Sequence, residues 1–332
     1  TPLYSSAASD VYKRQIFILL TITNVREKII DCIPPVLKHA VTAGIGLFIA
    51  FIGLANAGIV VNGATILQLG NLTDPLVLLT LFGLILAGIL LAKNVKGAFL
   101  LAMVVVSAIG MVAGLVQIPN AIVSAVPSIK PIFMQALSVP MDQIFSFDMV
   151  VVVFTFLFVD LFDTVGCLVG VASKGDMLDE NGKLPKAKQA LFADAIGTTI
   201  GALIGTSTVT AYVESASGIG EGGRTGLTSI TTGVMFLLAL FFAPIFTSIP
   251  TQATAPVLIL VGVMMASSLT KIDFNDFTNA IPAFLTFAMM PLAYSIADGI
   301  IFGIISFTVL KLATNKKSEV NLSLILLSIL FI

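Results

Sequence analysis

Long apolar stretches alternate with short polar loops along almost the whole chain. About 20 apolar residues in a helix cross the hydrocarbon layer of a bilayer. The apolar stretches that reach or approach this length are 39–61, 76–92, 97–116, 149–172, 187–204, 226–248, 253–270, 277–292 and 294–312. The pattern therefore predicts an all-α polytopic membrane protein, and the lipid bilayer is its first partner.

Both ends of the chain depart from this pattern. Residues 1–15 (TPLYSSAASDVYKRQ) are polar and stop abruptly at an apolar piece, 16–23, which is too short to span. We interpret 1–15 as a non-native or disordered leader and 16–23 as the remnant of a membrane helix. At the other end, 313–332 is interpreted as a cytoplasmic tail, because LSLILLSILFI (322–332) is also short for a span.

The composition agrees and excludes several classes of function. The chain is 57% hydrophobic and only 11% charged, whereas soluble domains carry about 25% charged residues. Its net charge of −1 offers no basic face to nucleic acid. Two cysteines and one histidine are too few for a disulfide framework, a zinc site or a histidine-based triad. We therefore expect neither a metal nor an organic cofactor, and no enzyme.

Basic residues fix the predicted orientation. Lysine and arginine concentrate in cytoplasmic loops, and here the loops 62–75, 117–148 and 249–252 together hold only Lys130. All other basic clusters fall on one side only if 206–223 (TSTVTAYVESASGIGEGG) itself crosses the membrane once. We therefore place the basic loops and the C-terminus in the cytoplasm and the protein in the cytoplasmic (inner) membrane.

The composition of 206–223 rules out an ordinary spanning helix. A helix over 187–204 rises about 27 Å and reaches the outer face. An extended strand over 207–212 returns about 20 Å, and a half-helix over 214–223 covers about 15 Å more. This arithmetic places Glu214 near the middle of the bilayer, at the N-terminus of a broken helix.

Two further carboxylates lie inside the apolar stretch 149–172. Asp160 is central in it, and Asp163 follows one helical turn later. Burial raises the pKa of a carboxyl group, so such groups suit proton coupling, and acidic residues at membrane depth mark transport pathways. The alternatives are a hydrogen bond between helices for the aspartates, and for Glu214 a charge that only complements the half-helix dipole.

A weak internal repeat supports a transporter. Residues 33–54 and 249–269 share an Ile-Pro entry followed by small residues and a glycine-containing apolar span. In the predicted topology the two segments run in opposite directions, as inverted repeats do. Broken helices that meet at the midplane of such repeats are the usual substrate site of secondary transporters.

Two longer runs carry a specific resemblance. FLFVDLFDTVGCLVGVASKGDMLDENGKLPKAKQALFADAIGT (156–198) and GTSTVTAYVESASGIGEGGRTGLTS (205–229) resemble the nucleobase–cation symporter family, and most closely its AzgA-like branch of adenine/guanine/hypoxanthine permeases. The likeness extends over nearly all of 16–332. It implies the uracil-permease fold, in which fourteen segments form two inverted repeats of seven.

The resemblance implies a core domain over 149–248, with strand 207–212 and half-helix 214–223, and a gate over 39–116 and 253–312. In this family the residue at Asp160 and the one at Glu214 contact the purine, and Asp163 supports binding and proton coupling. The resemblance thus implies that Asp160, Asp163 and Glu214 together couple transport to protons. The remaining substrate-binding positions implied are Thr210, Tyr212, Val213 and Ser215.

The implied activity is proton-coupled uptake of purine nucleobases by an elevator motion of core against gate, with the proton as coupling ion and a homodimer through the gate helices. One departure is the absence of the first three segments of the fold, including the partner of strand 207–212. We therefore expect that this chain of 332 residues does not transport by itself. Uptake of labelled hypoxanthine by it at normal affinity would refute that.

Other functions remain open at this point. A carrier of the same fold could take uracil, xanthine or a small anion, although an anion carrier would place positive charge where Glu214 lies. An intramembrane hydrolase using Asp160 and Asp163 is disfavoured because both aspartates lie on one helix. A non-transporting assembly subunit or an inactive fragment is the last alternative.

Overall fold

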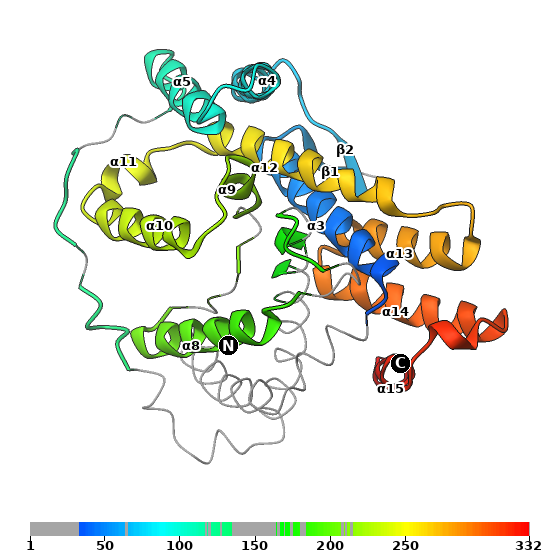
Figure 1. The fold of residues 1–332 in the computed structure, drawn as a ribbon. Coiled ribbons are helices and arrows are strands. Elements are labelled where there is room, and N and C mark those ends of the chain that lie inside the picture. The colour runs from blue at the N-terminus through cyan, green and yellow to red at the C-terminus, as the bar shows by residue number, and fades with distance from the viewer. Residues whose placement is uncertain are drawn as a thin grey trace. The chain divides into compact units, whose positions relative to one another are not determined.

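The protein is described by a computed structural model (Figure 1). It describes residues 33–63, 66–116, 118, 121–126, 128–134, 164, 167–168, 170–172, 175–179, 184–206, 209, 211–212 and 215–331. The elements are α3 (Pro35–Asn56), β1 (Val60–Gly63), β2 (Ile66–Leu69), α4 (Pro75–Ala92), α5 (Ala98–Val112), α8 (Ala187–Ile204), α9 (Ser215–Gly220), α10 (Gly226–Ala239), α11 (Ala243–Thr247), α12 (Thr251–Ala266), η2 (Ser267–Lys271), α13 (Phe277–Ala293), α14 (Ile296–Ala313), η3 (Lys317–Glu319) and α15 (Leu322–Leu330).

Most predicted spans appear as helices with nearly the predicted bounds. The stretches 76–92, 187–204 and 277–292 correspond to α4, α8 and α13. Within the described residues, the helices long and apolar enough to cross a membrane are Pro35–Asn56, Pro75–Ala92, Thr251–Lys271 and Ile296–Ala313. Most of the predicted span 149–172 lies outside the described residues.

The predicted single span 226–248 is wrong, because two helices occupy it. α10 ends at Ala239, and α11 begins at Ala243 with Pro244 in its first turn. Proline lacks the amide hydrogen and clashes with the preceding turn inside a helix, but it fits the first turn of a new one. Pro244 therefore restarts the helix rather than continuing α10.

Side-chain caps fix where several helices begin. The Asp74 carboxylate accepts a hydrogen bond from the Leu76 amide at 2.8 Å at the start of α4. Asp276 does the same for Thr278 at the start of α13, at 2.9 Å. Asn321 caps α15 through the Leu324 amide at 2.8 Å. Such caps satisfy amide groups that have no partner within the helix.

The chain divides into two compact units. One comprises residues up to 44, 127–213 and 268–332, and the other comprises 45–126 and 214–267. This grouping follows packing alone and does not test the predicted division into core and gate.

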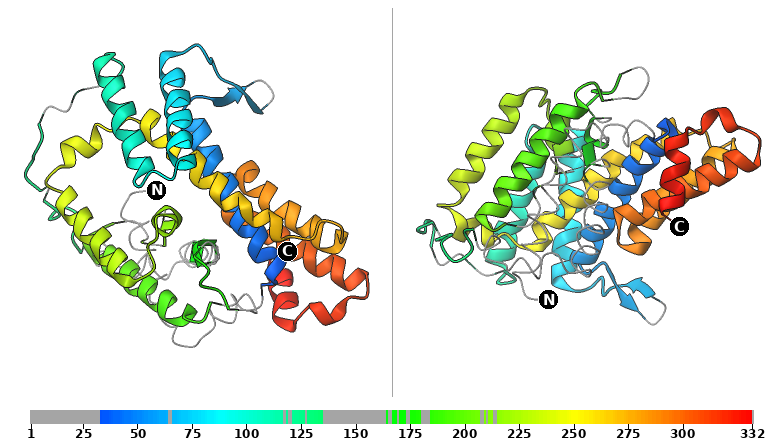
Figure 2. Two further views of the ribbon diagram at one scale, coloured as in Figure 1. Left: turned by 45° about the horizontal axis from the view of Figure 1, so that its top comes forward. Right: turned by 90° about the horizontal axis from the view of Figure 1, so that it is seen from below.

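In the second unit, α12 packs against α3 in the opposite direction (Figure 2). A methyl group on Gly46 would meet Met265 Cβ at 2.6 Å, and one on Gly53 would meet Ile259 Cγ1 at 2.9 Å. Residues later in α3 thus contact residues earlier in α12, so the two helices are antiparallel. The predicted opposite directions of these two Ile-Pro-led segments are confirmed, and glycine lets their backbones approach closely.

In the first unit, α13 and α14 form a tightly packed pair. Gly299 and Gly303 lie one turn apart on α14, and a methyl group on either would collide with α13. The Gly303 site faces Thr286, whose hydroxyl is fully buried and donates to the Pro282 carbonyl at 2.8 Å. This small-residue face is the usual means of close helix contact in membranes.

The predicted tail ends in a packed helix. In α15, Leu324 is fully buried and the Ser328 hydroxyl bonds to Thr308 on α14 at 2.7 Å. The nine residues of α15 rise about 14 Å. The sequence did not predict that it would pack against α14.

A short hairpin occupies the predicted loop 62–75. Strand β1 pairs antiparallel with β2, with Val60 opposite Leu69 and Gly63 opposite Ile66. No signal in the sequence analysis predicted this hairpin, because four-residue strands leave too little alternation to detect.

Candidate functional site

Two of the predicted substrate-binding residues, Tyr212 and Ser215, are described. Tyr212 is exposed, and Ser215 is the first residue of α9. The predicted site residues outside the described residues are Asp160, Asp163, Thr210, Val213 and Glu214. Their roles stay predictions.

The predicted strand 207–212 is anchored to α8. The buried Thr198 hydroxyl donates a hydrogen bond to the Val209 carbonyl, and Gly197 lies beside the Val209 side chain. The described residues of this segment are Val209, Ala211 and Tyr212. A side chain on α8 therefore satisfies the backbone carbonyl of Val209.

Replacing Thr198 by valine should loosen this segment. The Val209 carbonyl would lose its donor, and a typical intramolecular hydrogen bond contributes about 0.5–1.5 kcal/mol. Hydrogen exchange at residues 206–212 should become faster by about two- to tenfold. Thr199→Val is the matched control, because the Thr199 hydroxyl only donates to Ala195 one turn earlier in α8, at 2.7 Å. Equal exchange in both variants would contradict the anchoring role.

The predicted half-helix 214–223 exists but is shorter. α9 begins at Ser215, the residue after Glu214, and ends at Gly220. Gly222 has a positive φ of 103°, and the Gly223 amide donates back to the Gly218 carbonyl at 2.9 Å. This left-handed residue ends the helix because glycine adopts that conformation without steric cost.

Arg224 closes the C-terminal end of α9. Its Nη1 donates to the Ile219 carbonyl at 2.6 Å and to the Gly223 carbonyl at 2.9 Å. A cation at a helix C-terminus satisfies free carbonyls and complements the dipole. This role of Arg224 was not predicted from the sequence. The signal was an arginine directly after a glycine-rich helix end.

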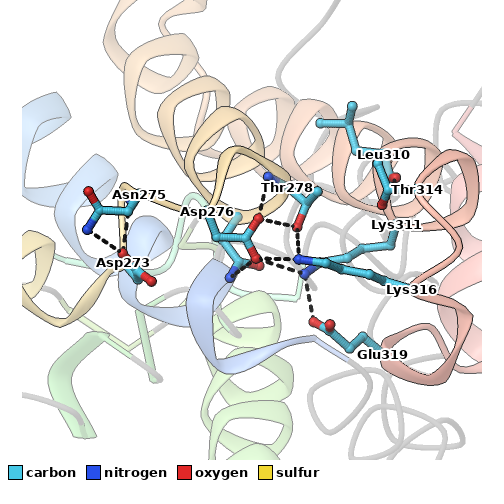
Figure 3. A network of polar contacts seen from close by, with 10 residues as sticks. Asp273, Asn275, Asp276, Thr278, Leu310, Lys311, Thr314, Lys316 and Glu319 are labelled. Carbon is cyan, nitrogen blue, oxygen red and sulfur yellow. Dashed lines mark hydrogen bonds and ion pairs between the residues drawn. The ribbon is translucent and has the colours of Figure 1, made fainter.

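A network of charged residues lies at the junction of α13, α14 and η3 (Figure 3). Lys316 Nζ lies 2.7 Å from Asp276 Oδ2 and 3.2 Å from Thr278 Oγ1. Lys311 Nζ lies 2.6 Å from Glu319 Oε2 and 3.9 Å from Asp276 Oδ2. The Lys311 side chain is 0% exposed, and its ammonium lies 5.2 Å from the centre of the Phe307 ring. This network was not predicted from the sequence.

Hydrogen bonds and charge shift two pKa values in the network. The hydrogen bond from Lys316, then those from Thr278, hold the pKa of Asp276 well below its ordinary value. The same contact with Asp276 raises the pKa of Lys316. Both groups therefore stay charged over the whole neutral pH range.

A pocket of about 410 Å³ adjoins this network. It is lined by Ile33, Pro34, Pro35, Val36, Asn279, Phe307, Glu319 and Asn321. Its lining joins the start of α3 to η3 and the cap of α15. Among the described residues, no group of His, Cys, Asp or Glu could hold a metal ion.

The long apolar helices are those of an integral membrane protein. A family described as "Permease family" matches residues 11–310, about nine-tenths of the chain. The chain belongs to this permease family. Membership fits the prediction of a transporter rather than an enzyme.

Two relatives place the chain in the predicted branch. It is 46% identical over 320 residues to the guanine/hypoxanthine permease PbuG of Bacillus subtilis, covering 96% of this chain and 72% of the relative. It is 43% identical over 316 residues to the adenine permease AdeP of Escherichia coli, covering 95% of this chain and 70% of the relative. The resemblance to the AzgA-like purine permease branch is therefore confirmed.

A solved structure supports the fold. The transmembrane domain of the cyanobacterial bicarbonate transporter BicA matches with a TM-score of 0.59 at 17% identity, over 91% of this chain and 77% of that one. At this identity the likeness concerns the fold alone. It agrees with the predicted fold family, while the number of segments per repeat stays a prediction.

Proposed function

We propose that this permease takes up purine nucleobases, with hypoxanthine, guanine and adenine as the candidate substrates, across the cytoplasmic membrane. The observation that carries the proposal is the high identity to permeases named for guanine/hypoxanthine and for adenine, at 46% and 43% over nearly the whole chain. The basic loops and the C-terminus face the cytoplasm in this proposal.

The half-helix supports a site for such a substrate. α9 begins directly after Glu214, so a carboxylate acceptor and free backbone amides lie together in the sequence. A purine offers N–H donors and acceptors along one edge and can use both kinds of partner. Asp160 supplies the second carboxylate, and Thr210, Tyr212, Val213 and Ser215 complete the proposed contacts.

Proton coupling is part of the proposal. Acidic residues at membrane depth are typical of proton pathways in transporters, and Asp160, Asp163 and Glu214 are the proposed proton carriers. The inward driving force is about 2.3 kcal/mol per charge for each 100 mV of membrane potential. Elevator motion of core against gate would carry the loaded site across. The antiparallel packing of α3 and α12 supports the inverted repeats on which such motion depends.

Competition uptake tests the substrate class. The complete gene is expressed in cells that lack their own purine permeases, and uptake of labelled hypoxanthine is measured. Unlabelled guanine, adenine or hypoxanthine should compete, while uracil and bicarbonate in equal excess should not. Competition by uracil alone, or transport of bicarbonate, would replace the proposal by one of the same-fold alternatives.

A further inference from the structure

The segment between α14 and α15 is fastened at both ends and in its middle. We call residues 314–321 the strap. It leaves α14 at Thr314, turns through Asn315 with a positive φ of 59°, and ends at Asn321, the cap of α15. α15 is itself held on α14 by the hydrogen bond between Ser328 and Thr308. Motion of the strap is therefore confined to a short loop between two fixed helices.

Two ion pairs tie the strap to the helices beside it. Lys316 on the strap reaches Asp276, the cap of α13, at 2.7 Å, and Glu319 on the strap reaches Lys311 of α14 at 2.6 Å (Figure 3). The strap thus contributes the cation Lys316 to one pair and the anion Glu319 to the other. Lifting the whole strap from α13 and α14 would separate both pairs.

The Lys311–Glu319 pair differs from the Lys316–Asp276 pair because its lysine is buried. The Lys311 side chain is 0% exposed, so its charge must be balanced within the protein. Glu319 supplies that balance, and the Phe307 ring adds a favourable contact with the cation. The Lys316–Asp276 pair is partly exposed, with 40% and 27% of the side chains accessible, and salt can screen it.

The strap also forms one wall of the pocket of about 410 Å³. Glu319 and Asn321 belong to the strap, while Pro34, Val36 and Asn279 belong to the opposite walls at the starts of α3 and α13. We propose that the strap is a lid, latched by the two ion pairs, whose opening uncovers this pocket and the buried end of Lys311. This lid shares no residue with the proposed substrate site and does not depend on the proposed function.

The Lys316–Asp276 pair of the latch should respond to salt and not to pH in the neutral range. Asp276 has a lowered pKa, so its contribution is complete above its unfolded-state pKa and is lost only as the pH falls through the still lower folded value. Lys316 has a raised pKa, so its contribution is complete below its unfolded-state pKa and is lost only as the pH rises through the higher folded value. Hydrogen exchange of the strap, corrected for intrinsic rates, should give the same protection from pH 6 to pH 9. A protection that changes with pH across this window would contradict the latch.

Charge-neutral variants test the latch by hydrogen exchange in lipid nanodiscs. Asp276→Asn keeps a side chain that caps helices well but removes the ion pair, and Lys316→Gln removes the other partner without touching the cap. Each should speed exchange at 316–321 by about two- to fivefold, as expected for a partly exposed pair. The double variant should exchange about as fast as Asp276→Asn alone, because Asp276→Asn already removes the pair with Lys316 and also the 3.9 Å pair with Lys311.

A matched control and a second readout decide the outcome. Asp273→Asn changes a nearby aspartate that accepts hydrogen bonds only within its own turn in the described network, from Asn275 at 2.9 and 3.0 Å, and should leave the strap unchanged. Cysteine placed at Asn279, with Cys32 and Cys167 replaced by serine, should react with a maleimide faster when Lys316→Gln is added. Unchanged exchange in both single variants, an equal effect of Asp273→Asn, or unchanged labelling would overturn the lid.

Discussion

Replacing Glu214 by glutamine is expected to raise the KM for hypoxanthine by about 10- to 100-fold, because a hydrogen bond to a charged group contributes about 1.5–3 kcal/mol. Glutamine preserves the size of the side chain but cannot carry or release a proton near neutral pH. The dependence of uptake on external pH should therefore weaken as well. Uptake of labelled hypoxanthine, measured at several concentrations between pH 5 and pH 8, gives both quantities.

Glu221→Gln is the matched control for this prediction. Glu221 follows α9 on an exposed position, and its Oε2 accepts only a long hydrogen bond from the Gly97 amide, at 3.5 Å, among the described contacts. Its replacement should leave the KM and the pH profile near those of the wild type. If Glu214→Gln behaved like Glu221→Gln, the predicted role of Glu214 in substrate binding would be wrong.

A methyl group at Gly303 is expected to disrupt the contact between α13 and α14. In Gly303→Ala the new Cβ would overlap the Thr286 hydroxyl, which is fully buried and held by the Pro282 carbonyl. Overpacking of this kind costs about 1–3 kcal/mol. The purified Gly303→Ala permease should melt at a lower temperature than the wild type. Size-exclusion chromatography of heated samples measures this melting temperature.

Two further variants separate this effect from a general one of alanine. A methyl group at Gly88 in α4 meets no atom within 4 Å, so Gly88→Ala should be neutral or stabilising by roughly 0.5–1 kcal/mol. Adding Thr286→Ala to Gly303→Ala removes the overlapping hydroxyl and should recover part of the lost stability. A Gly303→Ala protein as stable as Gly88→Ala would contradict the close packing described here.

The sequence predicted the features that depend on composition and length. Hydrophobic runs fixed α4, α8 and α13 nearly to the residue, since each run ends where charged or turn-forming residues begin. The distribution of basic residues and the length of 206–223 predicted a half-helix that starts at Glu214, and α9 begins one residue later. Hydrophobic runs, segment lengths and the positions of basic residues can be determined without knowing which segments contact each other.

The features that were missed depend on contacts between distant residues. Nothing near Lys316 in the sequence indicates that its partner is Asp276, forty residues earlier. The anchoring of Val209 by Thr198 likewise depends on how the chain returns past α8. Pro244 was a local signal for the break between α10 and α11, but the continuous apolar run 226–248 led to the prediction of a single span. Asp160, Asp163 and Glu214 were predicted from membrane depth and family resemblance, and they await functional tests.

The most direct test of the account is proton movement coupled to a purine base. The permease from the complete gene is reconstituted into proteoliposomes that contain a pH-sensitive dye, without any initial gradient. Adding hypoxanthine outside should acidify the lumen, while uracil should not, and Asp160→Asn should remove the signal. Hypoxanthine uptake without acidification would contradict proton coupling, and acidification with uracil but not with purines would contradict the proposed substrate class.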